Sequence, residues 1–204
     1  FLSDTGCNHN STILDIGCGS GRETEFISPI SKHITGIDLS QTAIDAFKTK
    51  GFEGVIADVR NLPLNDASYD FVICPEILHH LRGQGDLVDY VTEFTRVLKD
   101  NGYLIILEPN AFNPSGIMMN IANTLKPGIT GLVPHERALS PVSLQQLFKR
   151  VGLTDVQCVA ASYTWNRYPL GVSQFIAKHE DAIRYRRPFN LFGWFSIISG
   201  KKVL

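Results

Sequence analysis

A glycine-rich turn directly after an apolar run constrains the fold of this chain more than any other feature. Residues 13–21 read Ile-Leu-Asp-Ile-Gly-Cys-Gly-Ser-Gly, which places Gly17, Gly19 and Gly21 at alternate positions. Glycine is needed where the backbone turns tightly and approaches a ligand without a Cβ in the way. The helix expected after the turn presents unpaired N–H groups to that ligand. The segment therefore predicts a strand, a ligand-binding turn and a helix.

Short apolar runs alternate with amphipathic stretches along the rest of the chain. This alternation predicts an α/β fold in which parallel strands are joined by crossover helices. The runs are rich in Ile, Val and Leu, as expected of strands buried on both faces. The predicted strands are Ile13–Ile16, Ile34–Asp38, Val55–Ala57, Phe71–Cys74, Tyr103–Leu107, Val156–Ala161 and Phe195–Ser199.

Three helices have clear N-terminal signals. Ser40, Asp86 and Ser140 each stand where an N-cap is expected, and a proline follows Ser140 at the first helical position. Gly51 and Gly152 predict the ends of the first and third helices. The buried faces are predicted from helical spacing as Ala43, Ile44 and Phe47, then Leu87, Tyr90, Val91, Phe94, Val97 and Leu98, then Leu144, Leu147, Phe148 and Val151.

The segment 109–139 interrupts this alternation. It holds four prolines and three glycines around an apolar helical patch at Ile117–Leu125. We therefore expect one domain over residues 1–204 with an insertion after the fifth strand. Ligands of open α/β sheets sit beyond the carboxyl ends of the strands, so such an insertion is placed to form a lid or substrate segment.

Composition and charge indicate an ordinary globular domain and do not favour nucleic acid, membrane or metal as a partner. Hydrophobic residues make up 44% and charged residues 19% of the 204 residues, which is ordinary for a globular domain. A formal net charge of −1 does not favour nucleic acid or an anionic membrane. The four cysteines, at positions 7, 18, 74 and 158, show no C-x-x-C spacing, so we expect no metal. Free thiols suit a reducing compartment, so we expect a cytoplasmic protein.

The two ends of the chain carry further signals. The chain starts with Phe1 rather than Met, so we expect residues upstream, and no signal peptide is visible. The apolar stretch Phe189–Ile198 is shorter than the roughly 20 residues that span a bilayer, so we expect no transmembrane segment. Basic residues flank this stretch and leave an interfacial anchor as the alternative to a buried last strand.

The spacing of the glycines argues against a dinucleotide. A dinucleotide site follows G-x-G-x-x-G, but the position of the third small residue is here Arg22. The third glycine comes one residue early, and Asp15 lies on the strand before the turn. A buried acid below the turn suits a cationic ligand with a terminal amine. The alternative is a tight strand–helix turn without a ligand.

Two more acids close the next two predicted strands. Asp38 lies roughly 20 residues after the glycines, where a strand-end carboxylate can accept both hydroxyls of a ribose. The alternative for Asp38 is that it caps the helix at Ser40. Asp58 can accept from the exocyclic amine of an adenine. Acids at three successive strand ends predict a cleft of nucleoside size.

At these motifs the sequence resembles the class I S-adenosylmethionine-dependent methyltransferases, in the group related to quinone- and sterol-pathway enzymes. The resemblance covers about residues 12–108, through ILDIGCGSG, GIDLS, ADVRNLPLNDASYDFVIC, EILHHL and RVLKDNGYLIILEP. It implies a Rossmann-like, mostly parallel sheet of seven strands, the last antiparallel, with helices on both faces. It also implies S-adenosyl-L-methionine as cofactor. The implied contacts are Asp15, Gly17, Gly19 and Gly21 at its methionine part, Asp38 and Leu39 at the ribose, Asp58 and Val59 at the adenine, and Cys74, Pro75 and Glu76 near the methyl group.

Polar residues near the expected methyl position are the candidates for chemistry. His79 and His80 follow the fourth strand, and histidine titrates near neutral pH, so either is a candidate general base. The alternative is a packing role, and Glu76 is a further local candidate. His135 and Arg137 are candidate substrate contacts, because an arginine can hold a carboxylate or phosphate; the alternative is that they fix the insertion to the sheet.

These observations predict transfer of a methyl group (EC 2.1.1.-) to a small molecule by in-line displacement, in which the protein supplies position and a dry site. No Asn-Pro-Pro-Tyr run follows the fourth strand, which favours oxygen, carbon or aliphatic nitrogen acceptors over planar nitrogen. The alternatives are a nicotinamide-dependent oxidoreductase and a non-catalytic binding module. We expect no nucleic-acid partner.

Overall fold

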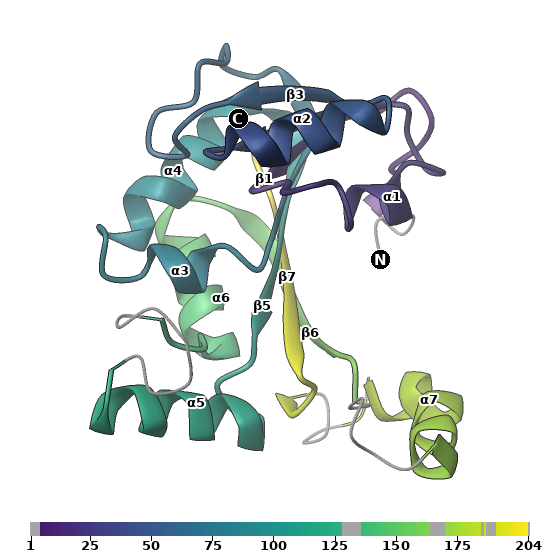
Figure 1. Cartoon of the computed structure of the whole chain (residues 1–204), viewed down its shortest axis with the longest axis vertical. Helices are drawn as coiled ribbons and strands as arrows, with labels where there is room; N and C mark the ends of the chain where they lie inside the picture. The colour runs from purple at the N-terminus through teal and green to yellow at the C-terminus, as the bar shows by residue number, and fades with distance from the viewer. Residues whose placement is uncertain (1–4, 128–135, 164–169, 185, 187–190, 204) are drawn as a thin grey trace.

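A computed structural model describes residues 5–127, 136–163, 170–184, 186 and 191–203 of the chain. Within these residues the strands form one sheet of seven, in the order β3-β2-β1-β4-β5-β7-β6 (Figure 1). All neighbours pair in parallel except β7, which is antiparallel to both β5 and β6. The strands are β1 Thr12–Ile16, β2 His33–Asp38, β3 Glu53–Ile56, β4 Tyr69–Pro75, β5 Leu98–Pro109, β6 Thr154–Ala161 and β7 Phe195–Lys201.

Helices lie on both faces of this sheet, as predicted (Figure 1). The larger core joins α3, α4 and α6 to one face through residues such as Leu14, Phe94 and Phe148. On the other face, Ile13 and Ile73 pack with residues of and after α1. The helices are α1 Thr24–Ile27, α2 Gln41–Thr49, α3 Leu78–Leu81, α4 Leu87–Val97, α5 Pro114–Leu125, α6 Pro141–Arg150 and α7 Leu170–Arg184.

The predicted N-caps are confirmed. The Ser40 hydroxyl accepts the Ala43 N–H at 3.2 Å, the Asp86 carboxylate accepts the Val88 N–H at 3.0 Å, and the Ser140 hydroxyl accepts the Ser143 N–H at 3.0 Å. These bonds satisfy donors that have no partner inside the helix.

Three local features differ from the sequence-based expectation. Leu98 continues the spacing of α4 but begins β5, where it pairs with Tyr69 in an extended conformation. The helix after the glycine turn has only four residues. The helix α7 between β6 and β7 was not predicted. In the first case strand pairing, a tertiary interaction, prevails over local periodicity.

The insertion is fixed to the end of the sheet by two buried asparagines. The side-chain amide of Asn110 donates to the carbonyls of Leu191 at 2.7 Å and Gly193 at 2.9 Å, and that of Asn113 donates to Phe192 at 2.9 Å. The predicted apolar patch forms α5. Residues 128–135 lie outside the described residues, so the predicted lid role stays a prediction.

The apolar stretch near the C-terminus enters β7, where Ser196 and Ile198 are fully buried. Its residues 189 and 190 and one residue of its basic flank, Arg187, lie outside the described residues. Among the helices of the described ranges, none has the length and apolar character needed to cross a bilayer.

We expect Asn110→Ala to destabilise the protein by about 1–3 kcal/mol, because two carbonyls at the buried base of the insertion lose their donor. Urea unfolding followed by circular dichroism measures the change. Asn65→Ala, at an exposed position, is the matched control and should unfold like the wild type. Equal midpoints for the two variants would show that these bonds contribute little to stability.

Candidate cofactor site and catalytic cluster

The glycine turn between β1 and α1 adopts a backbone that only glycine adopts easily. Gly17, Gly19 and Gly21 have φ of +71°, +51° and +81°. A Cβ on Gly17 would lie 2.2 Å from the side chain of Ile77, whereas one on Gly19 would meet nothing within 4 Å. Gly19 therefore faces open space, and the turn forms a cradle that a larger residue would partly fill.

Hydrogen bonds hold this turn against the end of β2. The N–H groups of Gly17 and Cys18 both donate to the carbonyl of Ile37, at 2.7 and 3.0 Å. The N–H of Gly19 donates to Asp38 Oδ2 at 3.0 Å, and the other carboxylate oxygen accepts the N–H of Ser40 at 2.8 Å. The bond of Asp38 to Ser40, which was the alternative to a ribose contact, is thus present together with a second bond to the turn. Each oxygen keeps a further lone pair for a ligand hydroxyl.

Asp15 is the buried acid below the turn, with 0% exposure. The Thr24 hydroxyl donates to its Oδ2 at 2.5 Å, while Oδ1 has no hydrogen-bond partner among the described residues. Burial raises the pKa of this carboxyl to about 7. An orphaned buried oxygen is costly unless a ligand or water supplies a donor. The turn and Asp15 together therefore fit a cofactor that carries an amine.

The third acid has a partner that sequence reasoning missed. Arg60 donates to both carboxylate oxygens of Asp58 and forms an ion pair with it, and these hydrogen bonds lower the pKa of Asp58. The side chain of Val59 lies in the main core, so only its backbone can border a ligand. Leu39 is 67% exposed beside Asp38.

The end of β4 makes a sharp turn beside these acids. Cys74 is fully buried, and Glu76 has a φ of +56°, a region that few residues other than glycine adopt. The Glu76 N–H donates to the carbonyl of Leu107 at 2.7 Å. Strained backbone of this kind clusters at functional sites.

Glu108, at the end of β5, fixes His79 in place. This carboxylate has 0% exposure and accepts the N–H groups of Ile77, Leu78 and His79 at 3.0, 2.7 and 3.2 Å. It also lies 2.7 Å from Nδ1 of the His79 ring. Glu108 was not predicted as a site residue, although it closes a predicted strand as the other acids do.

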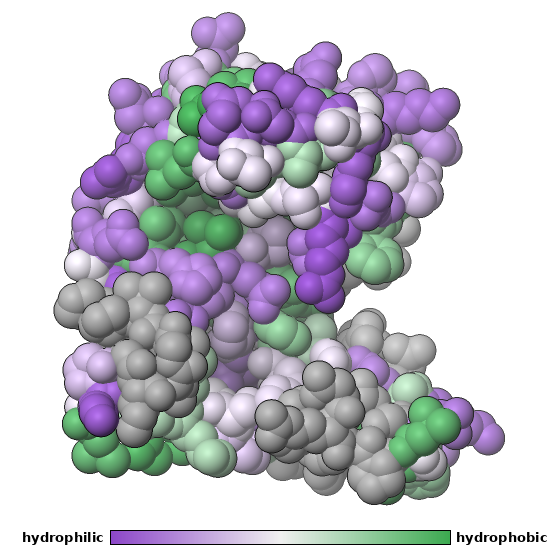
Figure 2. Space-filling model, viewed as in Figure 1, coloured by the Kyte–Doolittle hydropathy of each residue, from purple (hydrophilic) through white to green (hydrophobic). Residues whose placement is uncertain are grey.

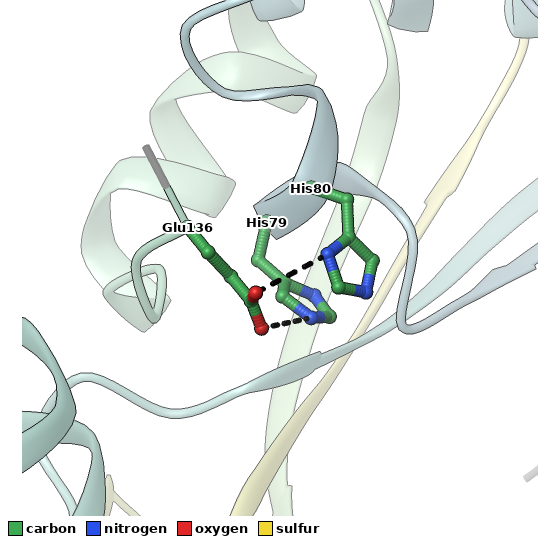
Figure 3. Close-up of side chains that lie close together, drawn as sticks. All are labelled: His79, His80 and Glu136. Carbon is green, nitrogen blue, oxygen red and sulfur yellow. Dashed lines mark ion pairs between the residues drawn. The ribbon is translucent and has the colours of Figure 1, made fainter. Parts of the chain in front are cut away.

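Glu136 lies on one side of the two histidines that follow β4, and its carboxylate faces both rings (Figure 3). Its Oε1 is 3.5 Å from Nε2 of His79, and its Oε2 is 3.6 Å from Nδ1 of His80. Burial lowers the pKa of His79, but the hydrogen bond to Glu108 and the charges of Glu108 and Glu136 outweigh it, so the pKa is raised. Burial and the neighbouring His79 lower the pKa of His80.

Of the two predicted substrate contacts, the structure describes Arg137 alone. Arg137 is half-buried directly after Glu136. His135 lies outside the described residues. Arg22 is exposed and pairs with Glu23 at 3.7 Å.

Residues 14–106 match the family described as "Methyltransferase domain". Over 148 residues the chain is 30% identical to a probable S-adenosylmethionine-dependent methyltransferase of Mycobacterium tuberculosis, covering 71% of this chain and 49% of that protein. It is 31% identical over 96 residues to the probable tRNA methyltransferase 9B of Homo sapiens, covering 47% of this chain and 21% of that protein. The chain thus spans about half the length of the mycobacterial relative. It spans a smaller share, 21%, of the human one.

The fold is similar to that of a solved S-adenosylmethionine-dependent methyltransferase from Thermotoga maritima, titled a possible histamine N-methyltransferase. The TM-score is 0.73 at 19% identity, and the match covers 98% of this chain and 88% of the other. This likeness confirms the predicted Rossmann-like fold, and together with the sequence matches it supports S-adenosylmethionine as the cofactor.

We expect Asp38→Ala to weaken binding of S-adenosylhomocysteine at least tenfold, or about 1.4 kcal/mol, because an acceptor for the ribose and the anchor of Gly19 are both lost. Isothermal titration calorimetry measures the affinity. The exposed Asp45 of α2 provides the control Asp45→Ala, which should bind like the wild type. Unchanged affinity in a folded Asp38→Ala protein would contradict the placement of the ribose.

The raised pKa of Asp15 predicts proton release when the cofactor binds. In the free protein this carboxyl is largely protonated below its pKa of about 7. A ligand ammonium favours the charged form and lowers that pKa, so binding at pH 6 releases a proton and affinity rises as the pH approaches 7. Titrations of S-adenosylhomocysteine in buffers of different ionisation enthalpy measure the proton count. In Asp15→Asn the release from this group should vanish; an equal release would assign the proton elsewhere.

Proposed function

We propose that this chain, which carries a class I S-adenosylmethionine-dependent methyltransferase domain, transfers the methyl group of the cofactor to a small-molecule acceptor. An apolar pocket of about 370 Å³ lies beside the end of β4 and is the main support for this proposal. Its walls include Phe26, Ile30, Pro75, Leu107 and Ile197. The volume falls within the range of small-molecule sites, which are mostly apolar with a few polar groups.

The pocket adjoins the place where the methyl group is expected. Pro75 is both a wall of the pocket and one of the residues implied near the methyl group. The molecule is hollowed on the side below α1, where these residues gather (Figure 2). An apolar acceptor bound there would stand next to the reacting carbon. Holding the two reacting groups in this way supplies a large part of the rate enhancement that an enzyme gives to a displacement reaction.

The residues of the cofactor site have distinct proposed roles. Asp15 accepts from the amine of the methionine part, Asp38 accepts the ribose hydroxyls, and Asp58 with its partner Arg60 borders the adenine. S-adenosylmethionine supplies the activated methyl group when bound. We place the reacting atom of the acceptor on the side of His79 and His80, which belong to the short helix α3 after β4.

Transfer to tRNA is the second candidate, because relatives that are named tRNA methyltransferases match this chain. The human one matches over 96 residues. A match of that length is long enough to contain the cofactor motifs, but it covers only 47% of this chain. The formal net charge of −1 gives no excess of basic groups for a phosphate backbone.

We expect the label of methyl-labelled S-adenosylmethionine to appear in a small-molecule fraction when the full chain is incubated with a cell extract. Mass spectrometry of the fractionated products identifies the acceptor and the methylated atom. Bulk tRNA, digested to nucleosides, is tested in parallel, and Asp38→Ala protein, which is expected to bind the cofactor at least tenfold more weakly, is the control with reduced activity. Label found in tRNA nucleosides instead would overturn the small-molecule proposal and leave the methyltransferase domain assignment intact.

A further inference from the structure

Two histidines and a glutamate converge on one point at the acceptor side of the site. One ring nitrogen of His79, one of His80 and one carboxylate oxygen of Glu136 all lie within 4.8 Å of one another (Figure 3). The residues come from segments far apart in the sequence, because α3 follows β4 and Glu136 precedes α6. We propose that these three side chains bind a divalent transition-metal ion such as Zn²⁺, which in turn holds an oxygen of the methyl acceptor.

The separations between the groups fit metal ligands better than hydrogen bonds. The two nitrogen–oxygen distances are 3.5 and 3.6 Å. Good N–H···O hydrogen bonds are shorter, at about 2.7–3.2 Å. Ligand atoms about 2.1 Å from a tetrahedral metal stand roughly 3.4 Å apart. The two nitrogen–oxygen separations, which involve different oxygens of the Glu136 carboxylate, are therefore close to the separation between two ligand atoms of one metal ion.

A second feature, independent of these distances, is that Glu108 positions the His79 ring. Glu108 holds Nδ1 of the ring at 2.7 Å and is itself fixed by three backbone N–H groups. With the proton kept on Nδ1, the lone pair of Nε2 points toward Glu136. Histidines that bind metals characteristically donate their other ring nitrogen to a carboxylate, which sets the tautomer and the ring orientation.

Burial and charge favour a dication at this position. Glu108 has 0% and Glu136 has 6% exposure, so two carboxylates meet one imidazole away from water. Two negative charges close together attract a divalent ion, and this attraction is stronger away from water. The set of two imidazoles and one carboxylate suits Zn²⁺ or Fe²⁺ rather than Mg²⁺ or Ca²⁺, which prefer oxygen ligands.

The cluster is open on the side of His80, whose side chain is 45% exposed. Three protein ligands leave a coordination position for water or substrate, as in catalytic rather than structural zinc sites. A metal there would lower the pKa of a bound hydroxyl and orient its oxygen. This part of the inference rests on the proposed function, and it narrows the acceptor to molecules with an oxygen donor. It also assigns the two histidines as ligands instead of general bases.

The metal site is tested with the metal alone, before any acceptor is known. The full chain is freed of metal by chelation and titrated with Zn²⁺ by calorimetry and with Co²⁺ by visible absorbance. We expect saturable binding of one ion, with Co²⁺ absorbance typical of nitrogen and oxygen ligands and without thiolate charge transfer. Glu136→Gln and His80→Gln should each weaken binding at least tenfold, and Glu108→Gln by about 10–100-fold through loss of the support of His79.

Matched controls separate this inference from the proposed function. His33→Gln, at an exposed position of β2, should bind Zn²⁺ like the wild type. His80→Gln alters a side chain that is about half exposed, so it keeps the test valid if Glu136→Gln fails to fold. Absence of Zn²⁺ binding, or binding that His80→Gln leaves unchanged, would overturn the metal site even where S-adenosylhomocysteine still binds. If the wild type binds Zn²⁺ but does not bind S-adenosylhomocysteine, the proposed function alone would be overturned.

Discussion

The hydrogen bonds between the glycine turn and the end of β2 hold the cofactor site together. Two consecutive N–H groups donate to one carbonyl, that of Ile37, and the next glycine donates to Asp38. These bonds extend the parallel register in which Ile16 is opposite Ile37. The turn continues the pairing of β1 with β2 beyond the last strand residue. The position of the proposed ribose contact is therefore fixed by a continuation of the pairing between β1 and β2.

Two buried carboxylates show how differently such a sheet can use an acid. Glu108 accepts three backbone N–H groups and faces one imidazole ring, so its desolvation is compensated within the protein. Asp15 accepts one hydroxyl and keeps an oxygen without a partner among the described residues. Burial without compensation costs stability. The satisfied acid is suited to positioning a neighbour, whereas the unsatisfied one is suited to receiving a ligand.

The sequence was sufficient to predict the sheet, the glycine turn and the helix N-caps, because the signals involved are local. Strand ends, glycines with positive φ and N-caps such as Ser40 each occupy a few consecutive residues. The cluster at His79 was not predictable in the same way. Its partners Glu108 and Glu136 lie 29 and 57 residues further along the chain, and no local period reports such contacts. The ion pair of Asp58 with Arg60 is close in sequence but depends on the rotamer of an exposed arginine.

The alternation of side chains along β5 explains why apolar and polar groups meet at one strand end. Successive strand residues point to opposite faces. Leu107 therefore lines the apolar pocket on the side of α1, while Glu108 points to the side of α3 and holds His79. An acceptor that lies across the end of the sheet would meet both surfaces at once. If both proposals hold, the acceptor is amphipathic, with an apolar body on one side of β5 and an oxygen on the other.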